Sequence, residues 1–257
     1  MKLTQLLAKL DYECLQGNMD KEVNGVVFDS RKVVRDSLFV CVRGAVVDGH
    51  IFAGEVAAKG ASVIVAEEAV EVPKTVTVVR VEDSRYALAL LSCAWFGNPA
   101  EKLKTIGITG TKGKTTTTYM VRSILENAGY KVGLIGTIET IIGDTVIPSE
   151  NTTPESYLVQ EYFARMVEAG CDCVVMEVSS QAMMLHRVAG FTFDYGIFTN
   201  IEPDHIGPNE HSSFEDYLRC KRRLLQQCKI GIVNRDDEHY EEMVEGHTCQ
   251  LETYGFQ

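Results

Sequence analysis

The strongest constraint on the fold is a strand, a glycine-rich turn and a helix that follow one another between residues 103 and 129. Residues 103–109 have the sequence LKTIGIT, which predicts a strand. The turn, TGTKGKTT at 109–116, leads into a helix that Gly129 ends and whose apolar face comprises Val121, Ile124, Leu125 and Ala128. A glycine-rich loop between a strand and a helix predicts a phosphate-binding loop, because its backbone amides can turn toward an anion.

Within this loop, the residue types indicate binding of a nucleoside triphosphate with Mg²⁺. Lys114 would reach the β- and γ-phosphates, and the Thr115 hydroxyl would bind the metal. The strict pattern requires a glycine at position 108, where the chain has Ile108, so the loop is a variant. The alternative is a Gly/Thr-rich turn that contains Gly-Lys-Thr by chance. A nicotinamide cofactor is not expected, because no GxGxxG with a downstream acidic partner occurs.

Helix and strand patterns alternate along the whole chain, which predicts an α/β fold with two domains. Residues 1–100 are expected to form a small Rossmann-like α/β domain, because Gly97-Asn98-Pro99 is a strong stop signal. Residues 101–257 are expected to form a mostly parallel α/β domain that the sequence leaves incomplete. Residues 1–16 predict an amphipathic helix rather than a signal peptide.

Composition excludes several classes of protein. A net charge of −11 argues against nucleic acid as a partner, because a duplex-binding surface carries a basic excess. No run reaches the roughly 18 apolar residues of a membrane span. The 8 cysteines are scattered without a CxxC pair, which predicts reduced core thiols in a cytoplasmic protein and no zinc site.

Two polar groups follow predicted strands of the second domain, at the edge where parallel sheets bind ligands. Glu177 lies near the end of the apolar run 173–178, where a carboxylate needs a cation or donors. A metal beside a triphosphate would supply the cation, and a frayed strand end is the alternative. Asn200 ends the strand 195–199, and His205 follows in the loop, either as a ligand or as a solvated side chain.

Lys221 lies in the apolar stripe of a predicted helix that begins near Ser213. Burial would lower the pKa of its amine, and a neutral amine can react with CO₂ to form a carbamate that binds metal. The alternative is a lysine whose stem packs while its ammonium group reaches solvent. The helical pattern alone favours this alternative.

Together these elements resemble the Mur ligase family. The landmarks occur in that family's order: TGTKGKTT (109–116), NTTP (151–154), MEVSS (176–180), HRV (186–188), FTN (198–200), DH (204–205) and YLRCKRRLL (217–225). FDSR (28–31), SLFV (37–40) and DGH (48–50) resemble the uridine-binding domain of the members that add the third stem-peptide residue.

The resemblance implies an ATP-dependent ligase of peptidoglycan synthesis. It would join lysine or meso-diaminopimelate to UDP-MurNAc-L-Ala-D-Glu through an acyl phosphate, with Mg²⁺. It implies that ATP contacts Gly110, Thr111, Lys112, Gly113, Lys114, Thr115, Thr116 and Asn200. It implies that metal is bound by Thr115, Glu177, His205 and carbamylated Lys221. It also implies that the catalytic set is Lys114, Glu177, His205 and Lys221. It implies that UDP-MurNAc-dipeptide contacts Phe28, Ser30, Asn151, Thr152, Thr153, Ser179 and Arg187.

The chain departs from the family pattern at several points. Leu185 replaces a common Gln, the turn at 206–209 differs, and Ala45-Val46 replace a His-Gln pair found in some relatives. The family's C-terminal domain, which binds the amino acid, is expected beyond residue 257. Other readings are a sister Mur or folylpolyglutamate ligase, or a non-catalytic module that binds UDP-sugar and ATP. We expect a monomer.

Overall fold

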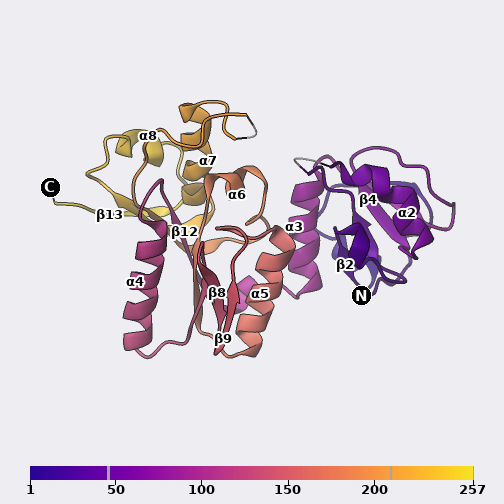
Figure 1. Cartoon of the computed structure of the whole chain (residues 1–257), viewed down its shortest axis with the longest axis horizontal. Coiled ribbons are helices and arrows are strands. Elements are labelled where there is room, and N and C mark those ends of the chain that lie inside the picture. Colours follow the sequence, from indigo (N-terminus) through magenta and orange to yellow (C-terminus); the bar gives the residue numbers. More distant parts are fainter. Residues whose placement is uncertain (45–46, 209, 257) are drawn as a thin grey trace. The chain divides into compact units, whose positions relative to one another are not determined.

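The computed structural model describes residues 1–44, 47–208 and 210–256, so the departures at Ala45, Val46 and Asn209 lie outside the described residues. The chain divides into two compact units, Met1–Gly97 and Asn98–Gln257. The division lies three residues before the boundary expected at residue 100. Both units are α/β, as the alternating sequence patterns predict (Figure 1).

The first unit is a five-stranded sheet of order β1-β5-β4-β3-β2, in which β2 to β5 are parallel and β1 is antiparallel. Asp83 is the N-cap of its helix α3, and the Asp83 carboxylate accepts from the amides of Arg85 and Tyr86. Its elements are α1 (Leu3–Leu6), β1 (Glu13–Gln16), β2 (Val26–Val27), η1 (Ser30–Lys32), β3 (Leu38–Val40), η2 (Gly49–Phe52), α2 (Ala53–Ala58), β4 (Val63–Ala66), β5 (Thr77–Arg80) and α3 (Ser84–Trp95).

The predicted helix over residues 1–16 is wrong beyond its first turn. Helix α1 ends at Leu6, and β1 pairs with β5 so that Cys14 lies opposite Val79. Gln16 adds side-chain hydrogen bonds to the carbonyls of Pro73 and Val76, and Glu13 forms an ion pair with Arg80. These partners lie about 60 residues away in sequence, so local helix propensity is overridden by tertiary pairing.

The second unit is an eight-stranded sheet of order β13-β12-β11-β6-β10-β7-β8-β9, parallel except for the hairpin strands β8 and β9. The antiparallel hairpin at this edge has no counterpart in the sequence prediction. The elements are η3 (Pro99–Lys102), β6 (Lys104–Thr109), α4 (Lys114–Asn127), β7 (Val132–Ile135), β8 (Glu139–Ile142), β9 (Thr145–Pro148), α5 (Ser156–Glu168), β10 (Cys173–Glu177), α6 (Ser180–Met184), β11 (Phe193–Phe198), α7 (Phe214–Gln226), β12 (Cys228–Asn234), α8 (Tyr240–Val244) and β13 (Gln250–Tyr254).

Helices cover both faces of this sheet (Figure 1). On one face, Val121 and Leu125 of α4 pack on a cluster that includes Ile108 and Val175. On the other face, α5 and α7 pack on Val174 and Met176. The prediction that Ile124 lies on the buried face of α4 is wrong, because Ile124 is 66% exposed. The parallel strands thus direct the loops after β6, β7, β10 and β11 to one edge.

A row of glycines lets α7 lie close to the sheet. Gly196 of β11 pairs with Gly107 of β6 and Gly231 of β12, so three neighbouring strands lack a side chain in register. A Cβ on Gly196 would lie 3.1 Å from Leu224 Cγ, and one on Gly231 would lie 2.9 Å from Leu225 Cδ2. The close packing fixes α7 against β6 and β11 and therefore fixes Lys221, one turn before Leu225, beside the loop that follows β6.

Candidate active site around the phosphate loop

The loop at residues 110–113 has the backbone of an anion-binding turn. Gly110 (φ 153°) approaches β11 so closely that a Cβ there would lie 2.0 Å from Thr199 Oγ1. Gly113 (φ 80°) is the N-cap of α4, whose first residue is Lys114. The first amides of a 14-residue helix, with the positive end of its dipole, therefore face the loop.

The end of β11 holds the loop in shape. Asn200 accepts from the Lys112 amide at 2.9 Å and donates to the Lys112 carbonyl at 3.0 Å, and its own carbonyl accepts from the Thr111 amide. Thr199 Oγ1 donates to the Lys112 carbonyl at 2.9 Å. Asn200, which was expected to contact ATP, thus uses its amide group to brace the loop. The exposed Lys112 ammonium pairs with Glu202.

Two lysines meet at one carbonyl oxygen. Lys114 Nζ and Lys221 Nζ donate to the Gly110 carbonyl at 2.9 Å and 2.7 Å. Burial lowers the pKa of Lys114, although Glu177 and Asp204 partly offset it. Burial and the neighbouring Lys114 charge lower the pKa of Lys221 well below its usual value. Lys221 is only 1% exposed, so the alternative of a lysine that reaches solvent is wrong.

Tyr217 links α7 to the phosphate loop. Its hydroxyl lies 3.0 Å from Thr111 Oγ1, and its ring lies 4.5 Å from Lys221 Nζ. Burial raises the pKa of this phenol to about 12. The apolar stripe of α7 was visible in the sequence, but the contact between Tyr217 and Thr111 was not, because the two residues lie 106 positions apart.

Glu177 is fully buried at the end of β10 and has a complete set of donors. Its carboxylate accepts from Thr115 Oγ1 at 3.0 Å and from the amide and hydroxyl of Thr137 at 2.9 Å and 3.0 Å. The alternative of a frayed strand end is therefore wrong. Thr137 was missed in the sequence, although its place just after β7 is the same strand-end signal that marked Glu177.

The loop of residues 151–153 contacts the backbone of Glu177. Thr153 Oγ1 donates to the Glu177 backbone carbonyl at 2.9 Å and accepts from the Ser179 amide at 3.1 Å. Thr152 Oγ1 lies 3.1 Å from Thr137 Oγ1, within hydrogen-bond distance. Thr115, Glu177, Thr152, Thr153 and Ser179 therefore lie together, although the resemblance assigns the first two to the metal and the other three to the muramoyl dipeptide. Asn151 is exposed.

Arg187 joins the same group from the segment after α6. Its Nη1 donates to the Thr153 carbonyl at 3.0 Å, and its Nη2 lies 2.8 Å from Glu155. The Nε donor is buried and has no hydrogen-bond partner among the described residues. A guanidinium that is 13% exposed and keeps unused donors is suited to an anionic ligand.

His205 is not brought into this group. Its side chain is 52% exposed, its Nδ1 lies 3.2 Å from Glu210, and its backbone has a left-handed φ of 53°. Its ring centroid lies 6.1 Å from that of Tyr217. The solvated alternative therefore describes His205 in this structure. Thr116, on the first turn of α4, is also exposed.

In the first unit, Phe28 and Ser30 follow β2 and are half-buried. The Ser30 carbonyl accepts from Lys59 Nζ at 3.1 Å, and Asp29 between them caps η1. Arg31 donates to Asp29 and lowers the pKa of that carboxyl to about 2. These residues form a polar turn at the carboxyl end of a parallel strand, which is where such sheets bind ligands.

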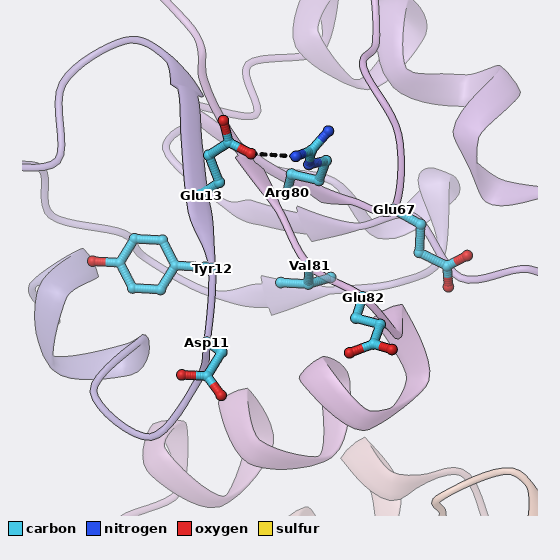
Figure 2. A pocket seen from close by; sticks show the side chains of 7 residues that line it. All are labelled: Asp11, Tyr12, Glu13, Glu67, Arg80, Val81 and Glu82. Atoms are coloured by element: carbon cyan, nitrogen blue, oxygen red, sulfur yellow. Dashed lines mark hydrogen bonds and ion pairs between the residues drawn. The ribbon is translucent and has the colours of Figure 1, made fainter.

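Figure 2 shows a separate hollow in the first unit, lined by Asp11, Tyr12, Glu13, Glu67, Arg80, Val81 and Glu82. Its guanidinium is already paired with the Glu13 carboxylate. Carboxylates therefore dominate its lining, and they would repel a pyrophosphate. We assign no ligand to this hollow.

The seven buried cysteines and exposed Cys14 are all free thiols, as their scattered positions predict. Among residues 1–44, 47–208 and 210–256, no helix is both long enough and apolar enough to cross a membrane.

The chain is similar to several known ligases. A protein of Clostridium perfringens named UDP-N-acetylmuramoyl-L-alanyl-D-glutamate–2,6-diaminopimelate ligase is 46% identical over 239 residues, which are 93% of this chain and 49% of that protein. A protein of the same name from Bacillus velezensis is 42% identical and covers 100% of this chain and 54% of its own length. The chain thus spans about half the length of the curated relatives it matches.

A solved structure with this enzyme name superposes with a TM-score of 0.85 at 21% identity, over 99% of this chain and 52% of that one, which supports the fold. The model of the Mur ligase family, catalytic domain, matches residues 22–95, and the model of the Mur ligase middle domain matches residues 108–257. With more than half of its residues matched by the middle-domain model, and a phosphate loop at the edge that the fold requires, the chain belongs to the Mur ligase family.

Proposed function

We propose that the chain carries the ATP site and the donor-substrate site of a cytoplasmic ligase that joins a diamino acid to UDP-MurNAc-L-Ala-D-Glu. One observation supports this most strongly: Glu177 connects the phosphate loop, through Thr115, to the 152–153 loop, through its backbone carbonyl. A carboxylate substrate bound at Thr153 and Arg187 would lie beside the terminal phosphate. That proximity is what formation of an acyl phosphate needs.

The donor set fits Mg²⁺. Thr115 and Glu177 present hydroxyl and carboxylate oxygens 3.0 Å apart, and hard oxygen ligands are those that Mg²⁺ prefers. Bound there, the ion would neutralise phosphate charge. Lys114 and the amides of residues 110–116 would hold the β- and γ-phosphates. The substrate carboxylate attacks the γ-phosphorus, ADP leaves, and the diamino acid's amine then displaces phosphate from the acyl phosphate.

Lys221 would act as a carbamate. Its neutral nitrogen attacks CO₂, one proton is released to solvent, and the lysine becomes an anion. Desolvation of the Lys221 ammonium and its proximity to Lys114 support this, because both disfavour the cation. With His205, the carbamate would bind a second cation. This requires the His205 imidazole to turn away from Glu210. Intact mass in bicarbonate should show one added CO₂ that Lys221→Met lacks.

The muramoyl dipeptide would be held by Asn151, Thr152, Thr153, Ser179 and Arg187, whose Nη1 already contacts the Thr153 carbonyl. Phe28 and Ser30 would contact the uridine. The relatives' names favour 2,6-diaminopimelate as the amino acid, and lysine is the other diamino acid that the chemistry accepts.

Calorimetric titration with UDP-MurNAc-L-Ala-D-Glu, with and without a magnesium–ATP analogue, tests the proposal. We expect tighter binding than for UDP-GlcNAc, and weaker binding in Arg187→Gln. Arg165→Gln is the matched control, because it removes the same charge from α5, where Arg165 lies over the ring of Tyr162. Equal affinity for the two nucleotide sugars by the folded chain would contradict the dipeptide site. Steady-state phosphate release separates a catalytic chain from one that only binds.

A further inference from the structure

Three side chains that can bind a transition metal converge at the start of α7, apart from the phosphate loop. They are His211, Asp216 and Cys220, whose ligand atoms all lie within 4.8 Å of one another. His211 is fully buried and Cys220 is 1% exposed. Asp216 and Cys220 are four residues apart on α7, so they lie on one face of the helix.

Backbone hydrogen bonds bring His211 to this face. Its amide donates to the His205 carbonyl at 3.0 Å, and its carbonyl accepts from the Gly207 amide at 3.2 Å. The spacing H-x₄-D-x₃-C lacks the paired ligands on which zinc sites are recognised in sequence. The cluster therefore becomes visible only when this loop closes on α7.

The His211 ring is oriented so that one nitrogen is free for a ligand. Its Nε2 lies 2.8 Å from Ser180 Oγ on α6. Its Nδ1 is buried and lies 3.4 Å from Asp216 Oδ2, yet it has no hydrogen-bond partner within the described ranges. A buried nitrogen without a partner is costly, and a cation between Nδ1 and the carboxylate would satisfy both.

The surroundings provide the outer partners that metal ligands use. Arg219 Nη2 lies 2.5 Å from Asp216 Oδ1, and Oδ2, which accepts from the Ser212 amide at 3.3 Å, lies 3.4 Å from His211 Nδ1 in the cluster. Ser180 fixes the imidazole through Nε2, which leaves Nδ1 toward the cluster. Metal-bound imidazoles and carboxylates are usually held in this manner through their second polar atom.

We propose that His211 Nδ1, Asp216 Oδ2 and Cys220 Sγ bind a zinc-class divalent cation. Binding replaces the Cys220 S–H bond with a metal–sulfur bond and releases one proton to solvent. The resulting thiolate and the carboxylate then balance the 2+ charge. A mixed nitrogen, oxygen and sulfur set selects Zn²⁺ over Mg²⁺, whereas the Thr115 and Glu177 oxygens select Mg²⁺. The ion would pin His211 to α6 and α7.

The other cluster of this kind does not qualify. Asp48, His50 and Glu68 also lie near one another. However, His50 Nδ1 is bound to Asp48 at 2.6 Å and Nε2 accepts from the Glu67 amide at 2.9 Å, so neither nitrogen is free.

Titration of the full chain with Co²⁺, in a phosphine reductant that contributes no thiol, tests the site. Cobalt bound to a thiolate absorbs intensely in the near ultraviolet, and the phosphate loop has no sulfur that could produce this band. We expect the band to saturate at one equivalent, to be displaced by Zn²⁺, and to be lost in Cys220→Ser. Cys14→Ser, which removes the exposed thiol, should retain it. Ser180→Ala should weaken binding about tenfold.

Two outcomes would overturn the proposal. One is the absence of a charge-transfer band at one equivalent of Co²⁺ in a chain whose circular dichroism shows it folded. The other is an undiminished band in Cys220→Ser. Asp216→Asn, nearly isosteric, guards against a folding artefact: a folded variant with unchanged Co²⁺ affinity also contradicts the assignment. None of these readouts depends on ligase activity, so the site can fail while the proposed function stands.

Discussion

Glu177 and Lys221 are both buried ionisable side chains beside the same loop, but the hydrogen bonds that offset the cost of their burial differ in number. The Glu177 carboxylate receives three hydrogen bonds, from Thr115 and from the amide and hydroxyl of Thr137. The Lys221 ammonium has the Gly110 carbonyl and the face of Tyr217. Gly110 shares that carbonyl with Lys114, a second cation.

The Glu177 carboxylate has donors on both of its oxygens, whereas the Lys221 ammonium is poorly compensated. Three donors satisfy the Glu177 oxygens that would bind a cation. Desolvation and the charge of Lys114 destabilise the Lys221 ammonium and lower its pKa, which favours the neutral amine. The same methionine substitution at both positions measures this contrast.

Glu177→Met should give the largest effect. It removes the acceptor of the Thr115 hydroxyl and of both Thr137 donors, and water can reach Thr137 because that residue is exposed. Each lost hydrogen bond costs about 0.5–1.5 kcal/mol net, so we expect a loss of about 1.5–4.5 kcal/mol in the free energy of unfolding. Urea denaturation followed by circular dichroism measures it. A loss below about 1 kcal/mol would mean that the carboxylate is not held as the hydrogen bonds indicate.

Gly196→Ala should break the comparison by moving Lys221. The new Cβ would lie 2.8 Å from Cys228 Sγ and 3.1 Å from Leu224 Cγ, so α7 must shift away from the sheet. Overpacking of this kind costs about 1–3 kcal/mol. Gly54→Ala is the matched control, because nothing lies within 4 Å of a Cβ there and α2 should gain about 0.5–1 kcal/mol. Equal behaviour of the two variants would argue against the close approach of α7.

The sequence was sufficient for the parts of the site that depend on local order. The strand, loop and helix at 104–127 and the strand end at Glu177 follow from apolar runs and glycines, because these signals lie within a few residues. Ser213 was also correctly identified as the cap of α7, where it accepts from the Asp216 amide at 3.2 Å.

Contacts that join distant segments could not be predicted in this way. Thr137, Tyr217 and His211 gain their roles from partners 40, 106 and 31 positions away, which no periodicity of the sequence specifies. β1 is a second example, because its residues have a helical sequence pattern but form a strand through pairing with the distant β5. The buried state of Lys221 needed the glycine row, which is a sheet-register feature spread over residues 107–231.

Tyr217→Phe should sharpen the comparison with a smaller effect. It keeps the ring over Lys221 but removes the hydrogen bond to Thr111, which should cost about 0.5–1.5 kcal/mol at pH 8. The folded pKa of about 12 lies above the ordinary tyrosine pKa of about 10, so the native state binds more protons between these values. Wild-type stability should therefore fall relative to the variant as pH rises from about 10 toward 12. Parallel denaturation curves at pH 9 and pH 11 check the sign.

Lys221→Met should have the smallest effect on stability and is the most informative. The variant removes a desolvated charge, and the Gly110 carbonyl that it releases still accepts from Lys114 at 2.9 Å, so no buried acceptor is left unpaired. Replacing a poorly compensated buried charge with an apolar side chain of similar length is often neutral or stabilising. We expect a change within about 1 kcal/mol in CO₂-free buffer, with loss of magnesium–nucleotide affinity when bicarbonate is present. A destabilisation as large as that of Glu177→Met would show that the ammonium is structural, and the contrast between the two buried charges would then not hold. A stable variant with lost affinity would instead mean that the lysine is retained for its ligand, because folding gains nothing from its charge.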